Sequence, residues 1–270
     1  AGLVLGAYAA TATITRELHK GTLASIISKP VSRALFFLSK FAGIAAIMTI
    51  FSVMATLATM LSVRTAAETF LFDWWGIGPL LASTLLAYAW AGIQNFRTRT
   101  PFVSRAFWLL ALAVIAAFAL SCLVDQRAQI FADDGHGHSH GAPADATASP
   151  IPWNILPAGL LIGMGILLLS AWSASLAIRL DTVPTLSICF TVFMTGLMSD
   201  YLFGRRAGDH VLFTLLYGLV PNWQNFWAVD ALTRGGIPDS YVWATGGYTA
   251  IYAAVVLLCG LVAFYRMEVK

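Results

Sequence analysis

The sequence predicts an all-α protein, a polytopic bundle of transmembrane helices formed as a single domain by residues 1–270. Two observations predict this class. Of the 270 residues, 59% are hydrophobic and 11% are charged, and the mean hydropathy is +0.76, which excludes an ordinary soluble domain. The apolar residues also form long runs, and a hydrocarbon core about 30 Å thick takes about 20 helical residues. Helices are expected because they satisfy their own backbone polar groups in lipid.

Six apolar runs are long enough to cross the bilayer. A seventh, residues 1–14, is too short and begins without Met, so we expect it to be the end of a helix whose beginning is absent, in a chain that is a fragment. The six predicted spans are residues 41–63, 77–94, 107–124, 156–178, 183–203 and 245–265.

The placement of basic residues predicts the orientation, because Lys and Arg accumulate in cytoplasmic loops. With the loop 15–40 inside and alternate crossing after it, eleven basic residues lie inside and five outside, and the inverted topology reverses this ratio. We therefore expect a multi-pass protein of the inner membrane with this loop and the C-terminus in the cytoplasm. The five outer residues are Arg64, Arg127, Arg205, Arg206 and Arg234.

The first two spans after residue 64 are predicted to form a helical hairpin, residues 77–124, around the basic turn NFRTRTPFVSR, which suits lipid headgroups. Trp74 and Trp75 are expected to anchor its start at the membrane interface. Residues 125–154 follow as a hydrophilic, flexible outer loop with too few large apolar residues to build a core.

The outer loop contains three alternating histidines beside two carboxylates. His136, His138 and His140 follow Asp133 and Asp134, and such groups suit weak binding of zinc or copper. Glycine spacing leaves the imidazoles unorganised, so binding would have to order the loop. A solvated linker is the favoured interpretation, and metal capture is the alternative.

The second half of the chain is predicted to hold a tight hairpin and a set of interfacial helices. Four residues join the spans 156–178 and 183–203, and Pro184 is tolerated in the first turn of the second. Residues 204–244 mix aromatic and polar groups, which predicts helices at the outer interface, one over 211–219 and a second over 222–233.

Several kinds of chemistry are missing from the sequence. It has no GxxxxGK[ST] run, no H-E-x-x-H and no G-x-S-x-G, so we expect neither ATP hydrolysis nor other enzyme activity by this chain, nor a nucleic-acid partner. Asp200 is the best candidate for an ionisable group within a span, and an ion-coupled carrier would need more. The cysteines, Cys122, Cys189 and Cys259, fall in apolar runs and are expected to act as small hydrophobes.

The loop 15–40 has the signals of a short helix followed by the start of a long one. Thr22 can cap a helix through Leu23, Ile26 and Ile27, and Pro30 stops it. Ser32 can cap the next helix. We therefore expect a short helix along the cytoplasmic face.

The residues of this loop resemble the membrane subunits of type-2 ABC exporters. The family's stretch reads approximately R-E-x-x-x-G-T-L, a short helix, S-K/R-P-x-S-R, and then G-K. The second half of the chain resembles the family too, whereas the hairpin 77–124 does not and looks like an insertion of two spans. The matching residues are Arg16-Glu17, Gly21-Thr22-Leu23, Ser28 to Arg33 and Lys40, with Ser39 in place of the usual Gly, and later Val220-Pro221-Asn222, Phe226-Trp227 and Asp230-Ala231-Leu232.

The resemblance implies a permease subunit (ABC-2 family transporter protein) that works with a second permease, identical or different, and with separate ATPase subunits that hold ATP and Mg. In that family the short helix of the loop fits a groove on the ATPase. The alternatives are a divalent-metal carrier that uses the histidines and a membrane scaffold without a transport cycle. The residues implied in coupling are Glu17, Gly21, Thr22, Leu23, Ile26, Ile27, Lys29, Pro30 and Arg33.

Overall fold

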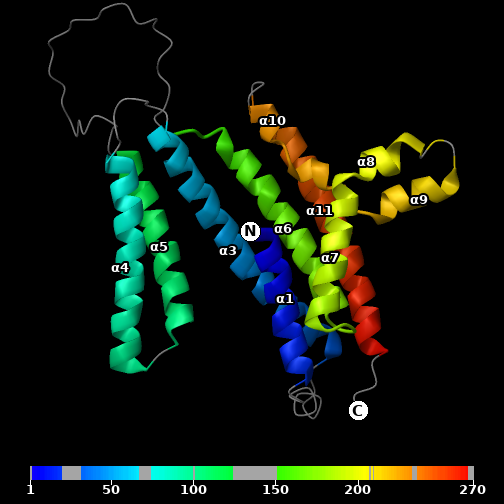
Figure 1. Cartoon of the computed structure of the whole chain (residues 1–270), viewed down its shortest axis with the longest axis horizontal. Helices are drawn as coiled ribbons and strands as arrows, with labels where there is room; N and C mark the ends of the chain where they lie inside the picture. Colours follow the sequence, from blue (N-terminus) through cyan, green and yellow to red (C-terminus); the bar gives the residue numbers. More distant parts are fainter. Residues whose placement is uncertain are drawn as a thin grey trace, which may run out of the picture. The chain divides into compact units, whose positions relative to one another are not determined.

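The computed structural model describes residues 2–19, 32–66, 74–99, 101–123, 151–206, 208, 210–232 and 236–266. Within these ranges every element is helical and no strand occurs (Figure 1). Five described helices, α3, α4, α5, α6 and α11, are long and apolar enough to cross a membrane, and the bent pair α7 and α8 makes a sixth if it is counted as one span. The chain is therefore an integral membrane protein.

Each predicted span overlaps a helix, although α3 begins eight residues before its predicted span and α7 ends within its own. The long ones are α1 (Gly2–His19), α3 (Arg33–Ala66), α4 (Trp74–Thr98), α5 (Phe102–Leu123), α6 (Ile155–Leu176), α7 (Thr182–Leu197) and α11 (Asp239–Tyr265). The short ones are α8 (Ser199–Leu202), η1 (Gly204–Arg206), α9 (Val211–Leu219), η2 (Trp223–Phe226) and α10 (Val229–Leu232).

The chain divides into two compact units. Ala1–Ser52 and Pro157–Lys270 make the first, and Val53–Leu156 make the second. The helix α3 is continuous across the division, so its first part belongs to one unit and its last part to the other.

The first unit is built on α6. In the most apolar stretch of α6, 50% of the residues are buried, whereas the corresponding share in α11 is 28%. Helix α1 packs on α6 through small and hydroxyl residues. Thr11 and Ser173 are fully buried, their hydroxyl oxygens lie 2.6 Å apart, and Ser173 donates to the carbonyl of Ala7 at 2.6 Å. Small side chains let the two backbones approach, and the hydroxyls pair within the contact, as is common between helices in lipid.

The start of α3 completes this core. The backbone N–H of Leu35 donates to the hydroxyl of Ser32 at 3.3 Å, which confirms the predicted cap. Phe37 then packs between α1 and α11, and its ring centroid lies 6.4 Å from that of Phe264. The beginning of α3 is thus fixed both by its cap and by an aromatic contact.

The second unit contains the predicted hairpin of α4 and α5, which run side by side in opposite directions (Figure 1). Its turn places Arg99 at a φ of 52°, in the left-handed region that a non-glycine residue seldom adopts. Arg105 donates from Nη1 to the side-chain oxygen of Gln94 at 3.3 Å and so links the two helices beside the turn.

Arg64 corrects the sequence analysis, which placed it in an outer loop. Helix α3 continues to Ala66, and Arg64 is only 2% exposed. Its Nη1 donates to the carbonyl of Ser121, in the last turn of α5. Carbonyls in the last turn of a helix lack an intrahelical partner and carry partial negative charge, so a cation there is favourable. The apolar run in the sequence ends at Val63, and a run of apolar residues does not predict a contact between Arg64 and a residue 57 positions away.

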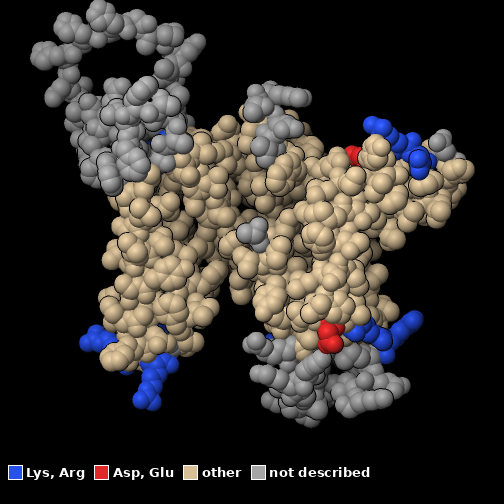
Figure 2. Space-filling model, viewed as in Figure 1, with Lys and Arg blue, Asp and Glu red and all other residues tan. Residues whose placement is uncertain are grey.

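The described charged side chains gather near the ends of the helices, and the long faces between them carry no charged side chain on the side shown (Figure 2). Large apolar side chains remain exposed along these faces, among them Leu85 and Leu86 on α4 and Ile251 on α11. Lipid tails solvate such faces, so this distribution agrees with a membrane-spanning bundle.

We expect Ser173→Leu to lower the stability of the chain by about 2 kcal/mol, because a larger side chain must separate α1 from α6 and the hydroxyl pairing is lost. Thermal unfolding in detergent measures the effect. Ser187→Leu, at an exposed serine of α7, is the matched control and is expected to leave the midpoint unchanged. Equal midpoints for the two variants would contradict the tight contact of α1 and α6.

Candidate functional site

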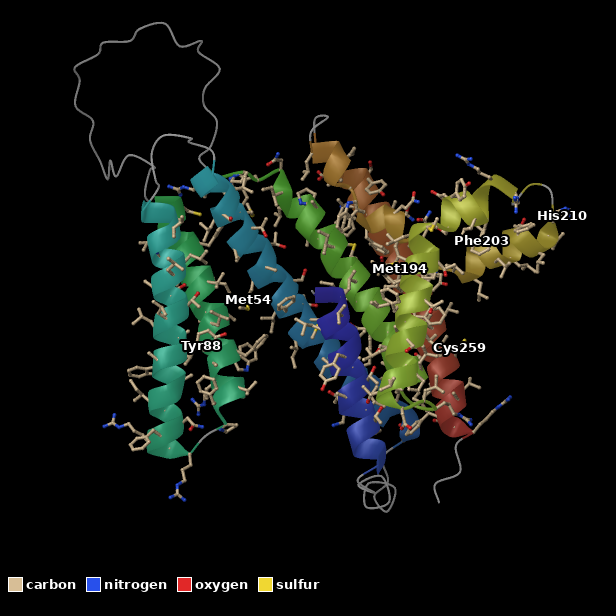
Figure 3. All side chains as sticks on the ribbon, in the orientation of Figure 1. Met54, Tyr88, Met194, Phe203, His210 and Cys259 are labelled. Carbon is tan, nitrogen blue, oxygen red and sulfur yellow. The ribbon has the colours of Figure 1, made fainter. Side chains whose placement is uncertain are left out.

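The helix α7 breaks where the sequence predicted a continuous span. It ends at Leu197, and the segment Ser199–Arg206 continues at an angle of 66° to it. Pro184 lies in the first turn of α7, as expected, but the helix is not continuous over the predicted span 183–203. Figure 3 labels Met194 before the break and Phe203 after it, and in Figure 1 α8 and α9 lead away from α7 and back.

Gly196 allows the chain after α9 to pack closely against the end of α7, just before the break. A Cβ at this position would lie 2.2 Å from Cδ1 of Trp223 and 2.3 Å from the backbone oxygen of Pro221. Only a residue without a side chain therefore lets the segment after α9 lie against the end of α7. Gln224 of the same segment donates from Nε2 to the carbonyl of Leu197 at 2.8 Å, so it satisfies an acceptor that the broken helix leaves open.

Asp200 accepts two hydrogen bonds just beyond the break. The hydroxyl of Tyr217 on α9 donates to its Oδ1 at 2.7 Å, and Nδ2 of Asn222 donates to the same oxygen at 2.9 Å. Asn222 also accepts the backbone N–H of Gln224 at 3.0 Å, as the cap of η2. One carboxylate thus ties α8 to α9 and to the start of η2.

Tyrosines bind the same segment to α11. The hydroxyl of Tyr248 accepts the backbone N–H of Asn222 at 3.1 Å, and the hydroxyl of Tyr252 donates to the carbonyl of Leu219. The hydroxyl of Tyr241 donates to the carbonyl of Asn225 at 2.9 Å. The chain from α9 to η2 is therefore held on one side by α7 and α8 and on the other by α11.

A cavity of about 480 Å³ opens beside Asp200. Its lining contains one negatively charged group, the carboxylate of Asp200, and one positively charged group, the guanidinium of Arg205. The Cζ of Arg205 lies 5.0 Å from the ring centroid of Tyr201. The hydrogen bond to Asp200, and then burial, raise the pKa of the Tyr217 phenol. The cavity can hold a polar or charged group. It is lined by Asp200, Tyr201, Gly204, Arg205, Tyr217 and Gln224.

The helices of the segment 204–244 agree only in part with the prediction. The first, Val211–Leu219, has the predicted bounds. The second, predicted over 222–233, is instead two short pieces, η2 and α10, separated at Trp227 and Ala228. Trp223 and Phe226 are buried in the core of the first unit, whereas Trp227 is 65% exposed. Their spacing of three suits a 3₁₀ turn, in which residues i and i+3 share a face.

The predicted coupling residues lie mostly outside the described part of the chain. Glu17 belongs to α1 and Arg33 is the first residue of α3, and nothing is described of their side chains. The other seven, Gly21, Thr22, Leu23, Ile26, Ile27, Lys29 and Pro30, lie in the segment between these helices that is not described.

The predicted metal ligands, His136, His138 and His140, also lie outside the described residues. Among the residues that are described, no group of three or more His, Cys, Asp or Glu side chains is placed to hold a metal ion. The metal-carrier alternative therefore stays a prediction from the sequence.

Residues 1–125 match the family model described as ABC-2 family transporter protein. Over this range, which is a little less than half of the chain, the sequence is similar to ABC-2 type permeases. The matched range contains the loop 15–40, on which the resemblance was first based, and it also contains α4 and α5. No curated protein and no solved structure matches the chain.

The match agrees with the resemblance, and together with the apolar helices it supports a membrane component of a transporter. Because it includes the hairpin 77–124, the interpretation of that hairpin as an insertion stays a prediction. Residues 220–232, which carry the second half of the resemblance, lie beyond the matched range. In the structure Pro221 of this segment is fully buried, and Asn222 makes the bonds that hold the break.

Gly196→Ala is expected to destabilise the chain by about 3 kcal/mol, because the new methyl group meets the backbone at Pro221, which cannot move aside as a flexible side chain could. Thermal unfolding in detergent measures this. Gly247→Ala on α11, where an added Cβ has nothing within 4 Å, is the control and is expected to be neutral or slightly stabilising. A neutral Gly196→Ala would contradict the packing of the break.

Asp200→Asn is expected to return the pKa of Tyr217 toward about 10, the usual value for tyrosine. The phenol donates to a carboxylate, so its folded pKa lies above its unfolded one. The stability from this bond is therefore complete below pH of about 10 and declines as the pH rises further. Phenolate absorbance, titrated with and without Tyr217→Phe in each background, isolates the one group. An unchanged midpoint in Asp200→Asn would exclude the carboxylate as the cause.

Proposed function

We propose that this chain is the permease subunit of an ATP-driven exporter, in which a separate ATPase subunit hydrolyses ATP with Mg and this subunit moves the substrate across the membrane. The family match over residues 1–125 carries the proposal, because that range contains the loop with the residues of the resemblance. The long apolar helices supply a membrane path, and the sequence contains no phosphate-binding loop of its own.

The two helices that flank the loop support a coupling role for it. Helix α1 ends at His19 and α3 begins at Arg33. Both pack in one core, in which Ala10 and Ile14 of α1 join Phe37 of α3 and residues of α6. A force on the segment between them therefore acts on two helices at once. Well-packed helices move as rigid bodies, so closure of an ATPase would tilt this part of the bundle.

The apolar contact with the ATPase is assigned to Leu23, Ile26 and Ile27, which fall on one face of the predicted helix. Glu17, Lys29 and Arg33 are assigned as its polar flanks. This division follows the common plan of an interface with an apolar centre and a charged rim.

The break after α7 is the place where we propose that the bundle bends. A single residue, Met198, joins α7 to α8, with φ of −103° and ψ of 9°. Hinges use such residues at the ends of elements to take up changes in backbone angles. The hydrogen bonds of Asp200 with Tyr217 and Asn222 would then break and re-form as α8 and α9 move relative to α7.

We propose an assembly of two permease subunits, identical or different, and two ATPase subunits in the inner membrane, with the loop 15–40 and the C-terminus in the cytoplasm. The eleven-to-five distribution of basic residues supports this orientation, although Arg64 is buried in its unit and does not lie in a loop.

The double variant Ile26→Asp, Ile27→Asp is expected to abolish association with the ATPase while leaving membrane insertion intact, because two charges cannot be accommodated in an apolar groove. Pull-down of the ATPase with the tagged permease measures association, and membrane fractionation measures insertion. Ser25→Asp is the matched control. It adds charge to the same segment on the opposite face of the predicted helix, so association is expected to persist.

Retained association in the double variant would overturn the coupling proposal. So would its loss in Ser25→Asp to the same degree, because the effect would then come from charge in the loop and not from an apolar contact.

A further inference from the structure

A second hollow of the first unit runs along α6 and α11, far from the loop and from Asp200 in sequence. Its volume is about 480 Å³ and its lining is almost wholly apolar. Trp172, Leu176, Tyr252 and Val255 line its length. Arg179 lines one end, and among the described residues it is the single charged side chain of this lining.

The hollow is a groove because α6 and α11 touch along its floor. A Cβ on Gly260 would lie 2.6 Å from Oγ of Ser175 and 3.0 Å from its Cα, so the two backbones are in contact there. The hydroxyl of Ser175 donates to the carbonyl of Val256 at 3.0 Å, which satisfies the one polar side chain on the floor. The larger side chains of Trp172 and Tyr252 line the same hollow.

The length of the groove equals the depth of one leaflet. It extends along α11 from Tyr252 to Ala263, and the eleven steps between these residues at about 1.5 Å each give about 16 Å. Half of a hydrocarbon core about 30 Å thick is about 15 Å. At the Tyr252 end, the hydroxyl of that residue donates to the carbonyl of Leu219 at the end of α9, and Leu219 also lines the groove.

The other end carries a fixed positive charge. Arg179 lies just after the end of α6, is exposed, and donates from Nη2 to the carbonyl of Ala263 on α11 at 3.0 Å. A guanidinium has five N–H donors in a planar fork, and the bond to Ala263 uses one of them. The other donors can bind further acceptors, and the oxygens of a phosphate group suit the geometry of the fork. No carboxylate of the described residues lines the groove, and Asp181, two residues further on, has its own partner.

We propose that this groove binds one anionic phospholipid of the surrounding bilayer, with an acyl chain along α6 and α11 and the phosphate on Arg179. The length selects a lipid chain that ends near the middle of the membrane, and the single cation selects a head of net negative charge over a zwitterionic one. In the predicted orientation this lipid belongs to the cytoplasmic leaflet. The site needs no ATPase, so it stands or falls separately from the coupling proposal.

The test uses the full chain, reconstituted in bilayers of equal parts phosphatidylglycerol and phosphatidylcholine, extracted gently and weighed by native mass spectrometry. Wild type is expected to retain phosphatidylglycerol in preference to phosphatidylcholine. Arg179→Gln is expected to lower the retained phosphatidylglycerol about fivefold or more. Arg266→Gln is the matched control, because Arg266 is also exposed, follows the end of α11 and is not part of the lining, so retention is expected to persist.

A second variant tests the groove itself. Cys259 lines it and is exposed (labelled in Figure 3), so Cys259→Trp is expected to fill it and displace the lipid whatever its head. Cys122→Trp, at an exposed cysteine of the second unit, is the control and is expected to retain it. Equal retention of the two lipids by wild type, unchanged retention in Arg179→Gln or Cys259→Trp, or an equal loss in Arg266→Gln would each overturn the proposal.

Discussion

The arrangement of the second half of the chain depends on one constraint, which is that a backbone polar group freed within a membrane protein needs another partner. The break after Leu197 frees acceptors at the end of α7, and Gln224 supplies a donor to one of them. Gln224 can reach it only because Gly196 lets the chain after Pro221 lie against α7. The bonds of Asp200 and of the α11 tyrosines then hold that chain in place, so the bend, the buried aromatics and the polar cavity all follow from one close approach.

Much of the fold is readable from the sequence, since a run of about 20 apolar residues has few alternatives to a spanning helix. The hairpin of α4 and α5, the cap at Ser32 and the bounds of α9 also depend on local signals, and the structure has them. The break of α7 and the burial of Arg64 depend on partners more than twenty residues away in sequence. No local pattern reports such contacts, and a glycine in an apolar run is ordinary in membrane helices.

The candidate site also contains some residues that the sequence indicated and others whose role depends on contacts between residues distant in sequence. The resemblance selected Val220, Pro221 and Asn222 without a physical reason, and the structure supplies one, because Pro221 is buried against α7 and Asn222 bonds to both α8 and α11. Asp200 was predicted from its charge alone. Tyr217, Gln224 and Gly196 were not predicted, because each acts through a neighbour that only the folded chain brings near.

The length of α3 has a consequence for the loop before it. Its 34 residues give a rod of about 51 Å, well beyond a hydrocarbon core of about 30 Å. The stretch of this helix that is apolar enough to cross a membrane, Ala34–Arg64, is 31 residues long and would itself measure about 46 Å. A helix longer than the hydrocarbon core tilts within the bilayer, bends, or extends beyond the lipid tails. The loop before α3 is therefore joined to a helix whose length exceeds what a perpendicular crossing needs.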